Sequence, residues 1–150
     1  MKLCLVNGVQ QNSIGIENRG LAYGDGLFTT AKIIKGQVQY LSLHVQRLLL
    51  GCEKLALIAP NKIELFEQLS QVAKPYDLAV LKVIITASSG GRGYARSENP
   101  VNNLIIMVHD YPKHYDELAI EGITLGNSKQ QIGINPMLNG LKHLNRLEQV

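Results

Sequence analysis

The chain has 150 residues, of which 45% are hydrophobic and 18% charged, and its formal net charge is +3. This length suits one domain with a sizeable core, the composition excludes fibrous and disordered proteins, and the scattered basic residues argue against a nucleic-acid partner. No apolar stretch is long enough for a signal peptide or a membrane span, and Cys4 and Cys52 form no CxxC pair, so we expect a cytoplasmic protein with free thiols.

Two β-hairpins are predicted in the first forty residues. In KLCLVNGVQ, apolar residues flank Asn7-Gly8, the dipeptide most typical of a two-residue hairpin turn. LFTTAKIIKGQVQYL repeats the pattern, with Lys35-Gly36 at the turn between two β-rich arms. The chain therefore opens with antiparallel strands.

Two amphipathic helices are predicted next. Ser42 is a candidate N-cap for the first helix. Asn61 and Glu64 have the spacing of a capping box at the start of the second helix, which Pro75 ends. Apolar residues recur at helical spacing in both segments: Val45, Leu48, Leu49, Cys52, Leu55 and Ala56, then Phe66, Leu69 and Val72.

The later segments predict strands and an incomplete helix. LAVLKVIITA and NNLIIMVHDY are nearly continuous apolar runs typical of central strands, joined by the glycine-rich SSGGRGYARSENP, and ITLGNSKQQIG resembles a third strand. In LKHLNRLEQV, Leu141, Leu144 and Leu147 are three residues apart. This spacing favours a helix, which we expect to be incomplete. The element order predicts an α+β fold, with an N-terminal domain over residues 1–112. We expect residues 113–150 to be a linker and the beginning of a second, incomplete domain.

Glycines and arginines indicate possible ligand contacts. In RGLAYGDGLFTT, Gly24 and Gly26 flank Asp25 and allow either a tight turn or a close backbone approach to a ligand. Arg47 lies one residue from the apolar stripe of the first helix, where it could bind an anion or extend into solvent. Arg92 and Tyr94, in GGRGYAR, could bind an anion from a loop.

Lys142 is the candidate nucleophile. A lysine reacts with carbonyl groups only when burial or nearby positive charge lowers its pKa, and most lysines are solvated. MVHDYPKHYDE contains two histidines and two aspartates without the spacing of a zinc or calcium site, so no metal is expected.

Four motifs together resemble one known family. NRGLAYGDGLFTT, LSLHVQRL, SSGGRGYAR and GLKHLNRLEQV, in this order, are similar to the class IV aminotransferases, the fold-type IV enzymes that use pyridoxal phosphate. The likeness covers essentially the whole chain. It implies a small-molecule substrate and a homodimer. It also implies a chain that continues well beyond the lysine, into a second domain that completes the cofactor site.

The resemblance implies roles for single residues. Lys142 would attach pyridoxal phosphate covalently and shuttle a proton, and Arg47, in the H-x-x-R motif, would bind the cofactor phosphate. Arg92 and Tyr94 would contact substrate carboxylates, with Thr29 and Thr30 near the cofactor.

The resemblance leaves three functions open. Amino-acid aminotransferases of the family commonly carry a Tyr-Glu pair where this chain has Phe28-Thr29. This difference favours a lyase branch that releases pyruvate from 4-amino-4-deoxychorismate and forms 4-aminobenzoate for folate synthesis. A D-amino-acid or branched-chain aminotransferase is the alternative, and an inactive fragment that only associates is the third.

Overall fold

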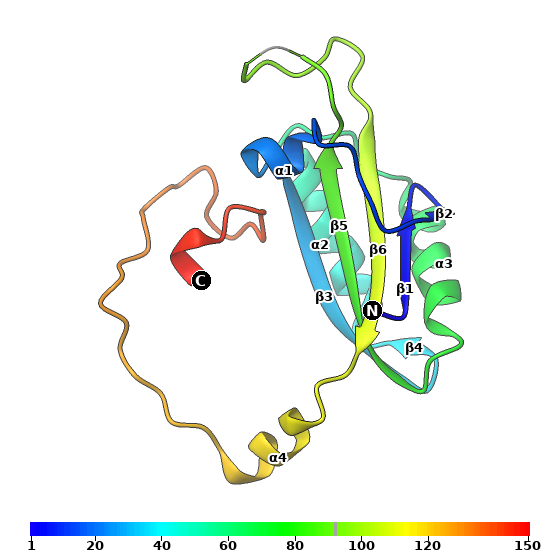
Figure 1. Cartoon of the computed structure of the whole chain (residues 1–150), viewed down its shortest axis with the longest axis vertical. Coiled ribbons are helices and arrows are strands. Elements are labelled where there is room, and N and C mark those ends of the chain that lie inside the picture. The colour runs from blue at the N-terminus through cyan, green and yellow to red at the C-terminus, as the bar shows by residue number, and fades with distance from the viewer. Residues whose placement is uncertain (92) are drawn as a thin grey trace.

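The computed structural model of the chain describes residues 1–91 and 93–150 and places a six-stranded sheet at its centre (Figure 1). The strand order is β2-β1-β6-β5-β3-β4, and every neighbouring pair is antiparallel. The strands are β1 (Leu3–Val6), β2 (Val9–Gln10), β3 (Gly26–Ile34), β4 (Gln37–Val38), β5 (Leu78–Ala87) and β6 (Asn102–Asp110). The helices are α1 (Arg19–Tyr23), α2 (Leu41–Lys54), α3 (Lys62–Ala73) and α4 (His114–Glu121), with a 3-10 turn η1 (Leu147–Gln149). The predicted α+β class is confirmed.

Both predicted hairpins are confirmed. Val6 pairs with Val9 across the Asn7-Gly8 turn, and Ile34 pairs with Gln37 across the Lys35-Gly36 turn. The φ angles are +52° and +81° in the first turn and +49° and +74° in the second. Two-residue hairpin turns of the I′ type need positive φ at both central residues, which explains the glycine in each.

The central strand pair is confirmed as well. β5 and β6 cover the two predicted apolar runs, and they pair from Ala79 with Asp110 to Ala87 with Asn102. Along the whole length of β3, each residue pairs with the other edge of β5. The three long strands therefore form the centre of the sheet.

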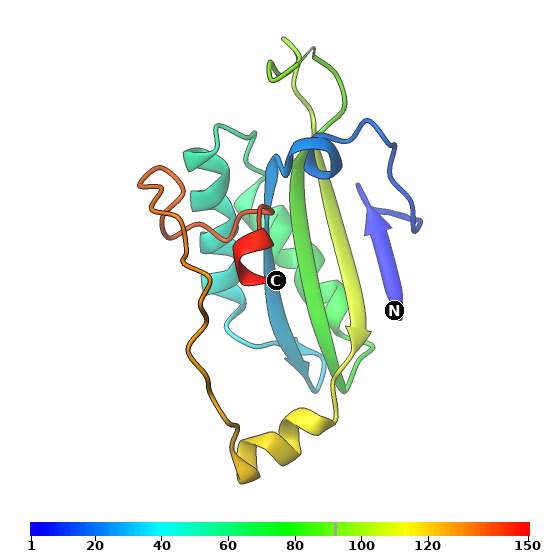
Figure 2. The ribbon, with the colours of Figure 1, turned by 60° about the vertical axis from the view of Figure 1, so that its left-hand side comes forward.

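Helices α2 and α3 cover one face of the sheet, as Figure 2 shows. Val45, Leu48 and Cys52 of α2 are fully buried against it, as predicted. The helix begins at Leu41, after Tyr40 in a left-handed conformation. Ser42 therefore lies inside the helix and the predicted N-cap was wrong, because Tyr40, whose side chain makes no capping hydrogen bond, occupies the N-cap position.

Helix α3 confirms its predicted start and corrects its buried face. The side-chain oxygen of Asn61 accepts hydrogen bonds from the backbone N–H groups of Ile63 and Glu64. The buried residues are Leu65, Leu69 and Ala73, each four residues apart, whereas Phe66 is 41% exposed. Four-residue spacing follows one stripe along a helix more closely than three-residue spacing does, so Phe66 lies beside the stripe.

The last forty residues differ from prediction. After α4 the chain follows a long irregular path and returns to the edge of β3 (Figure 1). Residues 123–133 form no strand, and Ile123, Leu125 and Ile132 are all exposed, since no sheet edge lies beside them to accept their backbone hydrogen bonds. The predicted terminal helix is also wrong, because residues 142–144 bind β3 as extended chain.

Within the described residues, no helix combines the length and the apolar character that crossing a membrane requires.

Candidate functional site

Lys142 is held at the edge of β3 by backbone hydrogen bonds. The Phe28 N–H donates to the Lys142 carbonyl at 2.9 Å, and the Leu144 N–H donates to the Gly26 carbonyl at 3.0 Å. β4 pairs only with the other end of β3, which leaves this edge open for residues 142–144. Two segments far apart in the sequence therefore meet at the start of β3.

The two glycines around Asp25 make this approach possible. A Cβ at Gly24 would lie 2.2 Å from the side-chain oxygen of Asn145, and a Cβ at Gly26 would lie 2.4 Å from the Ile85 carbonyl. A Cβ at Gly26 would also lie 2.9 Å from Leu144. The close approach expected of this glycine motif is therefore made by the chain's own segment 144–145.

Replacing Gly26 with alanine should lower the free energy of unfolding by about 1–3 kcal/mol, because the added methyl group overlaps backbone atoms that cannot move aside freely. Urea unfolding measures the change. Gly126→Ala is the matched control, since nothing lies within 4 Å of a Cβ at Gly126 and its φ is not positive. Equal stability of the two variants would contradict the packing described here.

The Lys142 amine lies over the Phe28 ring, in a strongly cationic setting. Its Nζ is 4.7 Å from the centroid of the Phe28 ring. Lys82 Nζ and the Arg146 guanidinium carbon lie 5.5 and 5.8 Å from the same centroid. Burial lowers the pKa of Lys142, and the positive charges of Arg146 and Arg47 lower it further. A lowered pKa increases the neutral fraction of the amine, which is the nucleophilic form.

Arg47 and Lys142 both line one recess at the edge of β3. Leu27, Phe28, Leu50, Gly51, Gly140 and Leu141 line, with Arg47 and Lys142, a recess of about 20 Å³. That volume holds about one water molecule, so a larger ligand would extend outward from it. The residues around this recess thus include one primary amine and one guanidinium, groups that suit a ligand with a carbonyl group and a phosphate.

Thr29 and His44 fix the orientation of Arg47. The Arg47 guanidinium donates to the Thr29 hydroxyl, and it lies 3.0 Å from His44 Nδ1, which is 2.7 Å from the same hydroxyl. Burial lowers the pKa of His44, and the positive charge of Arg47 lowers it further, which favours the neutral form of the ring. His44 is one helical turn before Arg47, and its role is absent from the sequence prediction.

The two threonines of β3 face opposite sides of the sheet. Thr29 is 1% exposed and contacts Arg47 on the helix-covered side. Thr30 is exposed on the other side, which also carries Phe28, and it is paired with Lys82 in the register. Only Thr29 belongs to the Arg47 contacts.

Tyr94 is not among the residues that line the recess. The Tyr94 side chain is 88% exposed, and its ring packs edge-on against Tyr23 at 5.7 Å. Arg92 lies outside the described residues. Their predicted contacts with substrate stay predictions.

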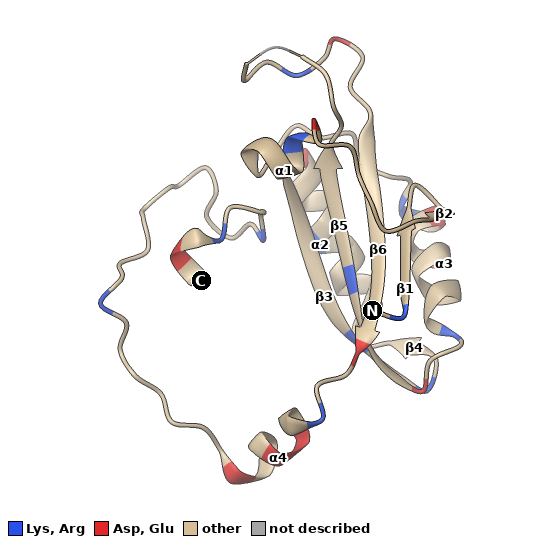
Figure 3. Cartoon of the chain, in the orientation of Figure 1, with Lys and Arg blue, Asp and Glu red and all other residues tan. Residues whose placement is uncertain are grey.

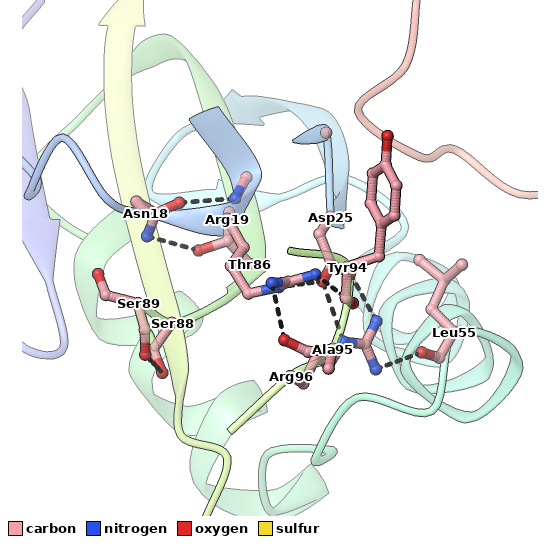
Figure 4. A network of polar contacts seen from close by, with 12 residues as sticks. Asn18, Arg19, Asp25, Leu55, Thr86, Ser88, Ser89, Tyr94, Ala95 and Arg96 are labelled. Atoms are coloured by element: carbon pink, nitrogen blue, oxygen red, sulfur yellow. Dashed lines mark hydrogen bonds and ion pairs between the residues drawn. The ribbon is translucent and has the colours of Figure 1, made fainter. Parts of the chain in front are cut away.

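A second group of charged residues, whose arginines sequence reasoning missed, is centred on Asp25 (Figure 4). We call Arg19, Asp25 and Arg96 the Asp25 cluster. The Asp25 carboxylate binds Arg19 at 2.9 Å and Arg96 at 2.5 Å, and the three side chains are 7%, 13% and 28% exposed in sequence order. An aspartate between two glycines was the available signal, but its partners are 6 and 71 residues away.

The Asp25 cluster predicts a loss of stability in acid. Burial raises the pKa of Asp25, but hydrogen bonds from Arg96 and Arg19 outweigh it and leave the pKa below its ordinary value of 3.8. The stability gained above the unfolded-state pKa is therefore lost as pH falls through the lower folded-state pKa.

The stability difference between wild type and Asp25→Asn should therefore stay constant near neutral pH and shrink below about pH 4. Urea unfolding at a series of pH values measures it. A difference that grows in acid would contradict this assignment.

Other charges are distributed along the chain. Figure 3 shows Lys and Arg on several strands, helices and loops. Across residues 1–91 and 93–150, no three or more His, Cys, Asp and Glu residues lie close enough together to hold a metal ion.

Comparisons with known proteins agree with this arrangement. The family model described as amino-transferase class IV matches residues 26–150. An aminodeoxychorismate lyase of Vibrio harveyi is 35% identical over 147 residues, which are 97% of this chain and 54% of that protein. The chain thus spans about half the length of this curated relative.

Solved structures give the same result. The crystal structure of 4-amino-4-deoxychorismate lyase from Pseudomonas aeruginosa matches with a TM-score of 0.87 and 35% identity, covering 98% of this chain and 54% of that one. A hypothetical aminotransferase from Mycobacterium tuberculosis, in a PLP-bound form, matches with a TM-score of 0.62 and 17% identity, covering 77% of this chain and 42% of that one. The second likeness shows the fold alone.

Proposed function

This chain belongs to the class IV aminotransferase family, and from that premise we propose that it is the lysine-bearing part of a pyridoxal-phosphate lyase. The reaction would convert 4-amino-4-deoxychorismate to 4-aminobenzoate and pyruvate, as a step of folate synthesis. The observation that carries the proposal is the single recess shared by Lys142 and Arg47. Both relatives at 35% identity have the name of this lyase.

The residues of the recess fit pyridoxal phosphate. The Lys142 amine, with its lowered pKa, suits covalent attachment to an aldehyde, and Arg47 suits a phosphate. Thr29 and His44 hold the Arg47 guanidinium in place before any ligand arrives. When bound, pyridoxal phosphate supplies an electron sink for the charge left after proton removal.

Lys142 also suits proton transfer. In its neutral form, Lys142 Nζ would be able to accept the proton from C4 of the substrate. Burial and the positive charges of Arg146 and Arg47 lower the pKa of Lys142, which makes its amine more often neutral than that of an ordinary lysine. The same positive charges favour a substrate with two carboxylates.

Phe28 favours the lyase over an aminotransferase. Its ring faces the Lys142 amine, where family aminotransferases commonly present a tyrosine hydroxyl. The hydroxyl of the next residue, Thr29, is hydrogen-bonded to Arg47 and His44. No phenol is therefore present at this position to help bind an amino acid.

The test is product formation by the natural full-length protein that carries this sequence. With pyridoxal phosphate and 4-amino-4-deoxychorismate, we expect equal amounts of 4-aminobenzoate and pyruvate. Efficient amino transfer between amino acids and 2-oxo acids, without 4-aminobenzoate, would overturn the lyase and favour the aminotransferase. For the 150-residue chain by itself, association in sedimentation together with neither activity would favour an inactive associating fragment.

We further propose a homodimer in the cytoplasm. Exposed apolar side chains, such as Ile16 at 84% and Leu21 at 64%, support an interface between copies. The free thiols Cys4 and Cys52 support a reducing compartment, and burial raises the pKa of Cys52 to about 11. Sedimentation equilibrium of the full-length protein tests the dimer, and a monomer at micromolar concentration would contradict it.

A further inference from the structure

The Asp25 cluster lies between the Lys142 segment and the loop that contains Tyr94. We propose that Asp25 is a positioning residue, which through Arg19 and Arg96 holds the main chain at residues 93–96 in a set place relative to Lys142. The effect of Asp25 on substrate binding rests on the proposed function. Its effect on the loop can be measured without any activity.

The Asp25 carboxylate joins the two arginines directly. Oδ2 accepts hydrogen bonds from Arg19 Nε at 2.9 Å and from Arg96 Nε at 3.0 Å, and Oδ1 accepts one from Arg96 Nη2 at 2.5 Å. The pairing with Arg96 is therefore bidentate, which adds geometric specificity to the contact. Because Arg19 is only 6% exposed, its charge would lack compensation without Asp25.

Arg19 uses its remaining donors to hold the loop backbone. Nη2 donates to the Tyr94 carbonyl at 2.9 Å, and Nη1 donates to the Ala95 carbonyl at 3.2 Å and to the Gly93 carbonyl at 3.4 Å. Three consecutive carbonyl groups thus converge on one guanidinium, as Figure 4 shows for Tyr94 and Ala95. The Tyr94 side chain is directed outward as a result, 88% exposed.

Arg96 ties the same loop to helix α2. Its Nη1 donates to the carbonyl groups of Leu55, at 2.9 Å, and Ala56, at 2.8 Å, just after the helix ends. Helix α2 also carries Arg47. The loop is therefore tied to the element that supplies the proposed phosphate ligand.

The turn that holds Asp25 also contacts the Lys142 segment. The Asp25 carbonyl accepts a hydrogen bond from Ala87 N–H at 3.0 Å, which fixes the turn on β5. Gly26 binds Leu144 through its backbone, and the Gly24 carbonyl accepts a hydrogen bond from Asn145 at 3.3 Å. One short turn therefore sets the positions of both the loop and the lysine segment.

Chymotrypsin cleavage of the full-length protein, loaded with pyridoxal phosphate, tests the loop. The carbonyl of the bond after Tyr94 is the one that Arg19 holds, and the bond after Tyr40, which is 75% exposed, serves as an internal reference. In Asp25→Asn we expect cleavage after Tyr94 to rise about tenfold relative to cleavage after Tyr40, because the loop opens more often. Asp110→Asn, which removes an exposed ion pair with Lys2, is the matched control and should leave the ratio unchanged.

Arg96→Gln is the second variant, for the case in which Asp25→Asn fails to fold. Its side chain is 28% exposed, and the Arg19–Asp25 ion pair remains. A rise in the cleavage ratio is expected here too, because the loop loses its attachment through Arg96 to Asp25 and to the end of helix α2, while the three bonds from Arg19 remain. An unchanged ratio in this variant would overturn the proposal.

Kinetics separate positioning from general damage. In both variants we expect the KM for 4-amino-4-deoxychorismate to rise about tenfold, kcat to change less, and the borohydride-reduced adduct to remain on Lys142. A looser loop with an unchanged KM would overturn the positioning role. If wild type shows no lyase turnover, the proposed function fails, while the cleavage ratio still decides whether Asp25 holds the loop.

Discussion

Replacing Lys142 with alanine is expected to abolish both covalent attachment of pyridoxal phosphate and turnover. The methyl group left behind can neither form a bond to the aldehyde nor move a proton. Rates should fall by roughly a thousandfold or more, the scale seen when a residue that is both nucleophile and base is removed. Lys142→Arg should be equally inactive, because a guanidinium keeps the charge and stays protonated.

Absorption spectroscopy and peptide mapping check this result. The wild-type protein should show an imine band with pyridoxal phosphate, and borohydride should fix the adduct on Lys142. Lys129→Ala, at an exposed position, is the matched control and should keep the band. Normal turnover by Lys142→Ala, or an adduct spread over many lysines in wild type, would contradict the assigned role.

Replacing Arg47 with glutamine is expected to weaken pyridoxal phosphate binding roughly 100-fold. A charge-assisted hydrogen bond to an ionised group contributes about 1.5–3 kcal/mol, and the guanidinium fork can make two such bonds to a phosphate. Thr29 and His44, which hold Arg47 in place, would lose that partner but remain on β3 and α2.

Ligand titration with and without the phosphate identifies the cause. Arg47→Gln should bind pyridoxal, which has no phosphate, as wild type does, while its affinity for pyridoxal phosphate falls. Lys54→Gln removes an exposed cation from the last turn of the same helix and should change neither affinity. Equal losses for both ligands would instead mean that Arg47 supports the fold and not the phosphate.

The parts of the fold that depend on local rules could be predicted from the sequence. Asn7-Gly8 and Lys35-Gly36 allow the positive φ angles that a tight hairpin needs, and the structure has them there. The apolar runs of β5 and β6 are buried on the helix-covered face, and Pro75 stops α3 where expected. Short-range stereochemistry and burial determine where these elements form, and both can be predicted from the sequence of a single segment.

The candidate site was predictable only in part. Lys142 and Arg47 were chosen by chemical type and family likeness, and the structure brings them to one recess. Asp25 was considered for its glycine neighbours, while Arg19 and Arg96 went unnoticed. An ion pair between residues 71 positions apart leaves no local pattern.

The sequence by itself determined the hairpins, the central strands, the two covering helices and the residue types available for chemistry, since these follow from backbone preferences and hydrophobic spacing. Only the tertiary structure decided the state of residues 142–144, whose leucine spacing favours a helix. The open edge of β3 offers those residues backbone hydrogen bonds, and glycines at positions 24 and 26 leave room for them. The hydrogen bonds to β3 outweighed the helical spacing of the leucines, because pairing the backbone groups of a short segment contributes more free energy than its helix propensity does.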